Sequence, residues 1–120
     1  RSYCVPHNRH HASECRDGIP AHGNFGSALR SHDSIESIDA WLRGLNKPVL
    51  DQWQVQVLVK ILMRCRVSLY SSLDSECVRG CKLTPTANLE GELREHLKSL
   101  GKGAPVAVLA EGPVTIPYVA

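Results

Sequence analysis

The sequence has few aromatic residues, no long apolar run and no excess of charge of one sign. Aromatic residues make up 5% of its 120 residues, and hydrophobic residues 42%. No apolar stretch approaches the roughly 20 residues that a helix needs to cross a bilayer, so no membrane-spanning segment is predicted. Acidic and basic residues are interspersed and the net charge is +2. No binding to nucleic acid or to a membrane surface is therefore expected.

A disulfide framework is also absent, because the five cysteines are an odd number at irregular spacings. Thiols that stay reduced are typical of the cytosol, which predicts a cytoplasmic location. The sequence has no Ser/His/Asp order, no Walker loop and no dinucleotide fingerprint. It begins with Arg1 and shows no signal-peptide pattern, and we expect it to be a processed product or a fragment.

The length of the chain fits one domain. Residues 1–11 are polar, rich in histidine and without helical or strand periodicity, so they are predicted to be a tail before a domain of residues 12–120. Apolar spacing and turn signals then predict a series of elements. Helices are expected at 24–30, 34–45, 52–64, 74–80 and 89–100, and strands at 67–71 and 105–110.

Two of these helices carry possible capping residues. Asp33 and Glu36 form a plausible capping box for the helix at 34–45. Asp51, with Gln54, can cap the helix that begins at residue 52. That helix has a single narrow polar stripe, which predicts that it is buried on most sides.

Helices that alternate with short apolar strands are typical of an α/β fold with parallel strands. We therefore expect a three-layer, Rossmann-like domain with a short, mostly parallel sheet flanked by helices. Only two strands are evident in the sequence, and a parallel sheet of two strands is not a stable unit. The sheet is accordingly expected to be incomplete at its N-terminal strand.

Three polar clusters are candidates for function: 14–20 (ECRDGIP), 51–54 (DQWQ) and 111–118 (EGPVTIPY). Ligands of open parallel sheets bind beyond the carboxyl ends of the strands. An indole N–H at the positive end of a helix can bind an anionic substrate, so Trp53 is predicted to be partly exposed at a cleft. Each cluster also has a structural explanation, as a turn or as a helix cap.

Taken together, the segments 12–25, 51–54, 67–74 and 108–118 resemble the C-terminal region of the nickel-dependent lactate racemase family. The resemblance implies a two-domain cytoplasmic enzyme with its active site between the domains. A nickel-pincer nucleotide, tethered to a lysine of the N-terminal domain, would take a hydride from a 2-hydroxy acid and return it to either face. No cofactor is expected on the isolated chain.

The resemblance also implies roles for residues of this chain. Trp53 matches a tryptophan near the cofactor and substrate, with Gln52, Glu14 and Asp17 as weaker candidates for binding. No catalytic residue is predicted here, because the cofactor-carrying domain, the expected partner, is not in this sequence. The chain alone is therefore expected to be inactive.

Two other functions stay open. The chain could be a non-catalytic module that binds a partner, or itself, through the uncovered sheet edge. It could also bind nickel or zinc weakly through the His-rich tail, because imidazole and thiolate suit these metals. The candidate ligands are His7, His10, His11 and Cys15, although their spacing matches no known zinc motif.

Overall fold

The computed structural model describes residues 8–19 and 22–109. Five helices and three strands occur in this part of the chain. In order, they are β1 (Arg9–Ala12), α1 (Phe25–Arg30), α2 (Ile35–Arg43), α3 (Gln52–Leu62), β2 (Val67–Tyr70), α4 (Ser75–Gly80), β3 (Thr84–Pro85) and α5 (Leu89–Leu100). None of the described helices is both long and apolar enough to cross a membrane.

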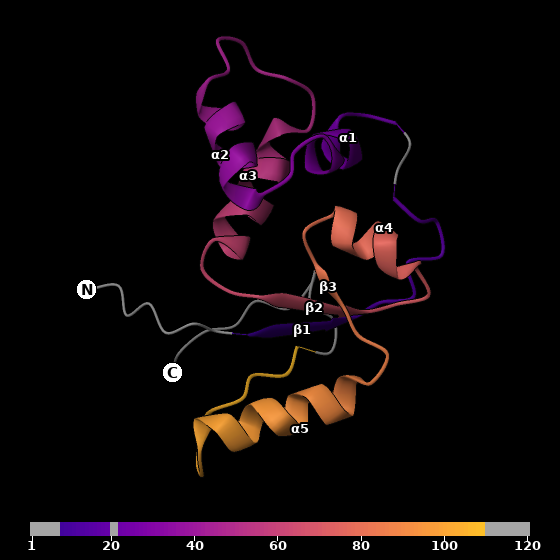
Figure 1. The fold of residues 1–120 in the computed structure, drawn as a ribbon, viewed down its shortest axis with the longest axis vertical. Coiled ribbons are helices and arrows are strands. Elements are labelled where there is room, and N and C mark those ends of the chain that lie inside the picture. Colours follow the sequence, from indigo (N-terminus) through magenta and orange to yellow (C-terminus); the bar gives the residue numbers. More distant parts are fainter. Residues whose placement is uncertain (1–7, 20–21, 110–120) are drawn as a thin grey trace, which may run out of the picture.

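The three strands form one parallel sheet in the order β1-β2-β3. Helices α1 to α4 lie on one face of the sheet and α5 lies on the other (Figure 1). The helices between β1 and β2, and α4 between β2 and β3, are the crossover connections that parallel strands require. This arrangement confirms the predicted three-layer α/β fold with a short parallel sheet.

The first strand lies where the sequence predicted a tail. Arg9 pairs with Val67, and Ala12 with Tyr70. A backbone N–H of Arg9 donates to the carbonyl of Arg66 at 2.9 Å. The expectation that residues 1–11 could not supply the missing strand is wrong for residues 9–11. Backbone hydrogen bonds hold this strand, and they need no alternation of apolar side chains, so the pattern gave no sign of it.

At the other end of the chain, the predicted strand at 105–110 is not found in its described part, 105–109. Val106 and Val108 are 52% and 84% exposed. The neighbour of β2 is instead β3, a strand of two residues that contains Pro85. The prediction counted apolar residues, whereas the pairing follows the position of α4, which delivers the chain to the edge of β2.

The helix starts differ from the predicted caps. Ser34, rather than Asp33, caps α2, and it exchanges hydrogen bonds with Ser37 in a reciprocal capping box. Asp51 precedes α3 in a left-handed conformation with φ of 63° and makes no side-chain bond to the helix. The cap that Asp51 and Gln54 were expected to form is therefore missing.

The main core lies among helices α1–α3, next to the end of α4, and a smaller cluster joins the end of α3 to the start of β2. The fully buried aliphatic side chains come from α1, α2, α3 and α4: Leu29, Ile38, Val55, Val59 and Val78. Only one face of α3 takes part, since Trp53 is 67% and Val57 52% exposed. The prediction that α3 is buried on most sides is therefore wrong. Its apolar residues cover two faces, one in the core and one at the surface.

Candidate functional site

A groove lies at the edge of the sheet where all three strands end. Its volume is about 850 Å³, and its walls are the residues that follow β1 and β2, one side of α4 and the end of β3. In open parallel sheets this edge is where ligands bind. The groove is therefore the candidate site within the described chain.

Backbone hydrogen bonds fix the floor of this groove. The N–H of Ser13 donates to the carbonyl of Tyr70 at 3.0 Å, and the N–H of Thr86 donates to the carbonyl of Leu69 at 3.0 Å. The hydroxyl of Ser72 donates to the carbonyl of Glu14. The three strand ends thus hold one another in place, and the side chains that follow them are presented on a rigid support.

The polar side chains of the groove come from different elements. Arg79 of α4 lines one wall and forms no ion pair with a described residue. Thr86 lines the wall after β3, and its hydroxyl oxygen accepts from the N–H of Asn88 at 3.3 Å. Glu14, after β1, forms an ion pair of 2.8 Å with the exposed Arg16. A guanidinium, hydroxyls and a carboxylate together suit a small ligand with one anionic and one hydroxyl group.

Of the predicted binding residues, only Glu14 lines this groove. Trp53 projects from the first turn of α3 and is 67% exposed, as expected, but the groove does not include it. Gln52 uses its side-chain oxygen to accept from the N–H of Val49 at 3.2 Å, which gives it a structural role. Asp17 is exposed in a turn that Gly18 closes by donating to Cys15.

The acidic residue before α3 also has a different role from the one predicted. The carboxylate of Asp51 accepts from the backbone N–H of Asn24 at 2.9 Å, and thus joins the loop after β1 to the start of α3. The third cluster, 111–118, lies outside the described residues.

The metal alternative is not supported in the described part of the chain. Residues 8–19 and 22–109 contain no group of three or more His, Cys, Asp and Glu side chains that could hold an ion. His10 faces Glu92, and His11, the next residue of β1, is exposed. Cys15 is a free cysteine in a turn, and His7 lies outside the described residues. Successive residues of a strand point to opposite faces, which separates these two histidines.

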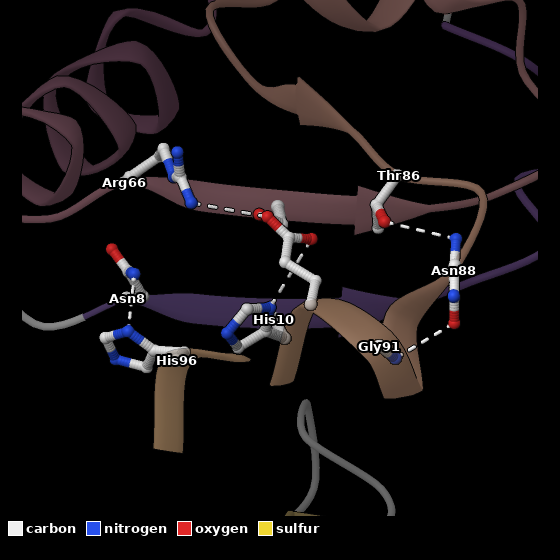
Figure 2. A network of polar contacts seen from close by, with 9 residues as sticks. Asn8, His10, Arg66, Thr86, Asn88, Gly91 and His96 are labelled. Atoms are coloured by element: carbon white, nitrogen blue, oxygen red, sulfur yellow. Dashed lines mark hydrogen bonds and ion pairs between the residues drawn. The ribbon is translucent and has the colours of Figure 1, made fainter. Parts of the chain in front are cut away.

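A second polar cluster lies between α5 and the sheet, and the sequence gave no sign of it (Figure 2). Glu92 of α5 accepts hydrogen bonds from Ser68 of β2 at 2.8 Å and from Arg66 at 3.3 Å. His10 of β1 approaches the same carboxylate at 3.9 Å. These residues are 24 or more positions apart from Glu92, and no local spacing could have connected them.

The comparisons with known proteins agree with this fold. The family model of the lactate racemase C-terminal domain matches residues 10–116. The lactate racemase of Thermoanaerobacterium thermosaccharolyticum is 27% identical over 103 residues, covering 84% of this chain and 24% of that protein. The structure of its apoprotein superposes with a TM-score of 0.63 at 25% identity, over 82% of this chain and 24% of the other.

The chain thus spans about a quarter of the length of the curated relative that it matches. The match of the family model begins at residue 10, inside β1, which agrees with the strand that the structure places there. By this match, which covers most of its length, the chain belongs to the lactate racemase C-terminal domain family.

Proposed function

We propose that this chain is the C-terminal domain of a lactate racemase-like, nickel-pincer-dependent isomerase that acts on 2-hydroxy acids in the cytoplasm. The observation that carries the proposal is the groove at the carboxyl edge of the sheet, in a domain of this family. Isolated from the domain that would carry the cofactor, the chain would be inactive.

The groove residues suit the two polar groups of a 2-hydroxy acid. Arg79 can bind the carboxylate through parallel N–H···O bonds, because its guanidinium has no ion-pair partner among the described residues. The hydroxyl of Thr86 can donate to a ligand oxygen, since its oxygen already accepts from Asn88. Glu14 can accept from the substrate hydroxyl on the opposite wall.

The described residues do not fit a nickel centre. They bring no three metal-binding side chains together, and the groove offers hydroxyls, one guanidinium and one carboxylate. The nickel-pincer nucleotide would accordingly be held by the N-terminal domain. The C-terminal domain, which is the present chain, would help to bind and orient the substrate.

Trp53 is proposed to face the N-terminal domain. Its large exposed surface in this chain, with Leu50 also 67% exposed nearby in the sequence, supports that role. Trp53 belongs to the first turn of α3, where the helix dipole favours an anionic partner. Asp17 is exposed and free to contact the same domain, whereas Gln52 would first have to release Val49.

Reconstitution tests this function. The chain is joined to a cofactor-loaded N-terminal domain of the family, and the interconversion of L- and D-lactate is followed by chiral chromatography. We expect racemisation by the joined protein and none by either part alone. Failure of a folded, cofactor-loaded assembly to racemise lactate and other short 2-hydroxy acids would refute the proposal.

A second candidate is a non-catalytic module that associates with itself or a partner. The observation that favours it is the pair of exposed apolar residues Trp53 and Val57, four positions apart on α3. Apolar side chains at such spacing are typical of helix-in-groove contacts. Light scattering separates the two: a concentration-dependent dimer that Val57→Lys disrupts would favour association, and a stable monomer would oppose it.

A further inference from the structure

Helix α5 is held against the sheet without a buried side chain of its own. No residue from Leu89 to Leu100 is buried, although the helix covers the face of the sheet opposite to α1–α4 (Figure 1). Apolar burial usually fixes a helix on a sheet. Polar contacts with the sheet therefore contribute to the attachment, and several of them centre on Glu92.

The carboxylate of Glu92 reaches from α5 to residues of β2 and of the segment before it. One oxygen, Oε1, accepts from the hydroxyl of Ser68, a side chain that is 1% exposed, at 2.8 Å. It also accepts from Nη2 of Arg66 at 3.3 Å. The other oxygen, Oε2, is buried and has no hydrogen-bond partner in the described part of the chain.

His10 faces this free oxygen from β1. Its side chain is 11% exposed, and its Nδ1 lies 3.9 Å from Oε2 of Glu92. Neither ring nitrogen has a hydrogen-bond partner among the described residues. Buried polar atoms without partners are costly. A proton on His10 would make this pair an ion pair, and an approach of a few tenths of an ångström or more would bring the two atoms within hydrogen-bond distance.

Two other side chains that can carry a positive charge lie around the pair of His10 and Glu92, namely Arg66 and His96. Arg66, which precedes β2, is 56% exposed, so solvent screens its charge. His96 of α5 lies with its ring centre 6.0 Å from that of His10. The side-chain nitrogen of Asn8 contacts Nδ1 of His96 at 2.9 Å.

The start of α5 is connected to the groove. Asn88 caps the helix by accepting from the N–H of Gly91 at 2.9 Å. The N–H of Asn88 donates to the hydroxyl of Thr86 at 3.3 Å, and Thr86 lines the groove. A change in the position of α5 therefore reaches the groove wall through two hydrogen bonds.

We propose that His10 and Glu92 form an acid-tightened latch, which docks α5 on the sheet when His10 is protonated and thereby fixes the groove wall at Thr86. Histidine is the side chain that ordinarily changes charge between pH 5 and 8. Lowering the pH would strengthen the attachment of α5 to the sheet, and raising the pH would weaken it. Only the consequence for ligand binding rests on the proposed function; the latch itself does not.

Hydrogen exchange of the full chain tests the latch without any ligand. Protection factors of the α5 amides, corrected for intrinsic exchange, are compared between pH 5.5 and pH 8. We expect protection to fall about five- to tenfold at the higher pH, the size of one ordinary hydrogen bond in net free energy. The amide shifts of Thr86 and Asn88 should follow the same titration as the ring protons of His10.

Two variants and one control separate the latch from a general effect of pH. His10→Asn and Glu92→Gln should each abolish the pH dependence of α5 protection. His11→Asn changes the next, exposed residue of β1 and should leave it intact. Unchanged protection of the wild-type chain from pH 5.5 to 8, or the same pH dependence in His10→Asn, would overturn the latch. If a variant fails to fold, the ring-proton titration of the wild-type chain decides: amides of α5 that do not follow it contradict the proposal.

Discussion

The carboxylate of Asp51 accepts a hydrogen bond of 2.9 Å from the backbone N–H of Asn24, 27 residues earlier in the chain. This contact joins the loop after β1 to the start of α3. It also explains why the side chain of Asp51 makes no cap for its own helix. The cluster at 51–54 is thus bonded to Asn24, a residue that no motif marked.

Gly23 makes this contact possible. Its φ is +78°, and a Cβ at this position would lie 2.1 Å from Oδ2 of Asp51. Gly23→Ala should lower the free energy of unfolding by about 1–3 kcal/mol, through the strained φ and the clash together. In an Asp51→Gly background the clash is gone, so the same change should cost less. Urea denaturation of the four proteins measures the difference, and equal costs in both backgrounds would show that the clash contributes nothing.

Replacing each of the two tryptophans should change the stability of the chain by a different amount. Trp53→Ala should change the stability of the isolated chain by less than about 0.5 kcal/mol, because the side chain is largely exposed. Trp41 packs on the core and against His32, so Trp41→Ala should cost about 2–3 kcal/mol. In the joined enzyme, loss of the indole N–H in Trp53→Phe should reduce turnover about tenfold. Unaltered turnover and substrate binding would remove Trp53 from the site.

Arg79 should contribute to substrate affinity rather than to folding. In the joined enzyme, Arg79→Ala should raise KM for a 2-hydroxy acid about tenfold, because a carboxylate loses its charged partner. Arg43→Ala, which removes an exposed charge from α2, is the matched control and should leave KM unchanged. Steady-state kinetics checks both, and equal KM values for the two variants would place the substrate elsewhere.

Stability should fall at alkaline pH because of one thiol. Burial raises the pKa of Cys81, and the nearby Cys77 adds to the rise. The folded chain therefore keeps a proton that the unfolded chain releases above about pH 8.5. Stability is full below that pH and declines as the pH rises toward the folded pKa, by at most about 1.4 kcal/mol per pH unit for one proton.

Cys81→Ala should flatten this alkaline decline, measured by urea denaturation from pH 8 to pH 10. Val78→Ala is the control, since it removes buried volume from the same region without removing an ionisable group. That variant should be less stable at every pH and keep the wild-type slope. A wild-type slope in Cys81→Ala would assign the decline to another group.

The helices could be predicted because their evidence is local. Ile35, Ile38 and Leu42 recur at helical spacing, and α2 forms where they lie. Strand β1 could not be predicted, because three of its four residues are polar and only His10 is half-buried. Such a strand has no apolar period. Conversely, Val106 and Val108 form an apolar run that the described structure leaves exposed.

The candidate site was predictable only in part. Glu14 was named because it lies in a segment that resembles the lactate racemase C-terminal region, and it does line the groove. Arg79 and Thr86 reach the same groove from α4 and from the end of β3. Nothing in their local sequence distinguishes them from surface residues, since their importance arises from the parallel order of the strands, which brings three distant strand ends together.

The proline in β3 has a consequence for solubility. Thr86 directs its N–H toward β2, and alternation along a strand turns the preceding backbone nitrogen, that of Pro85, toward the outer side. A proline nitrogen has no hydrogen to donate, so another chain cannot readily add a strand there. This border of the sheet is protected against domain swapping and fibre growth by a residue that contributes little to the core.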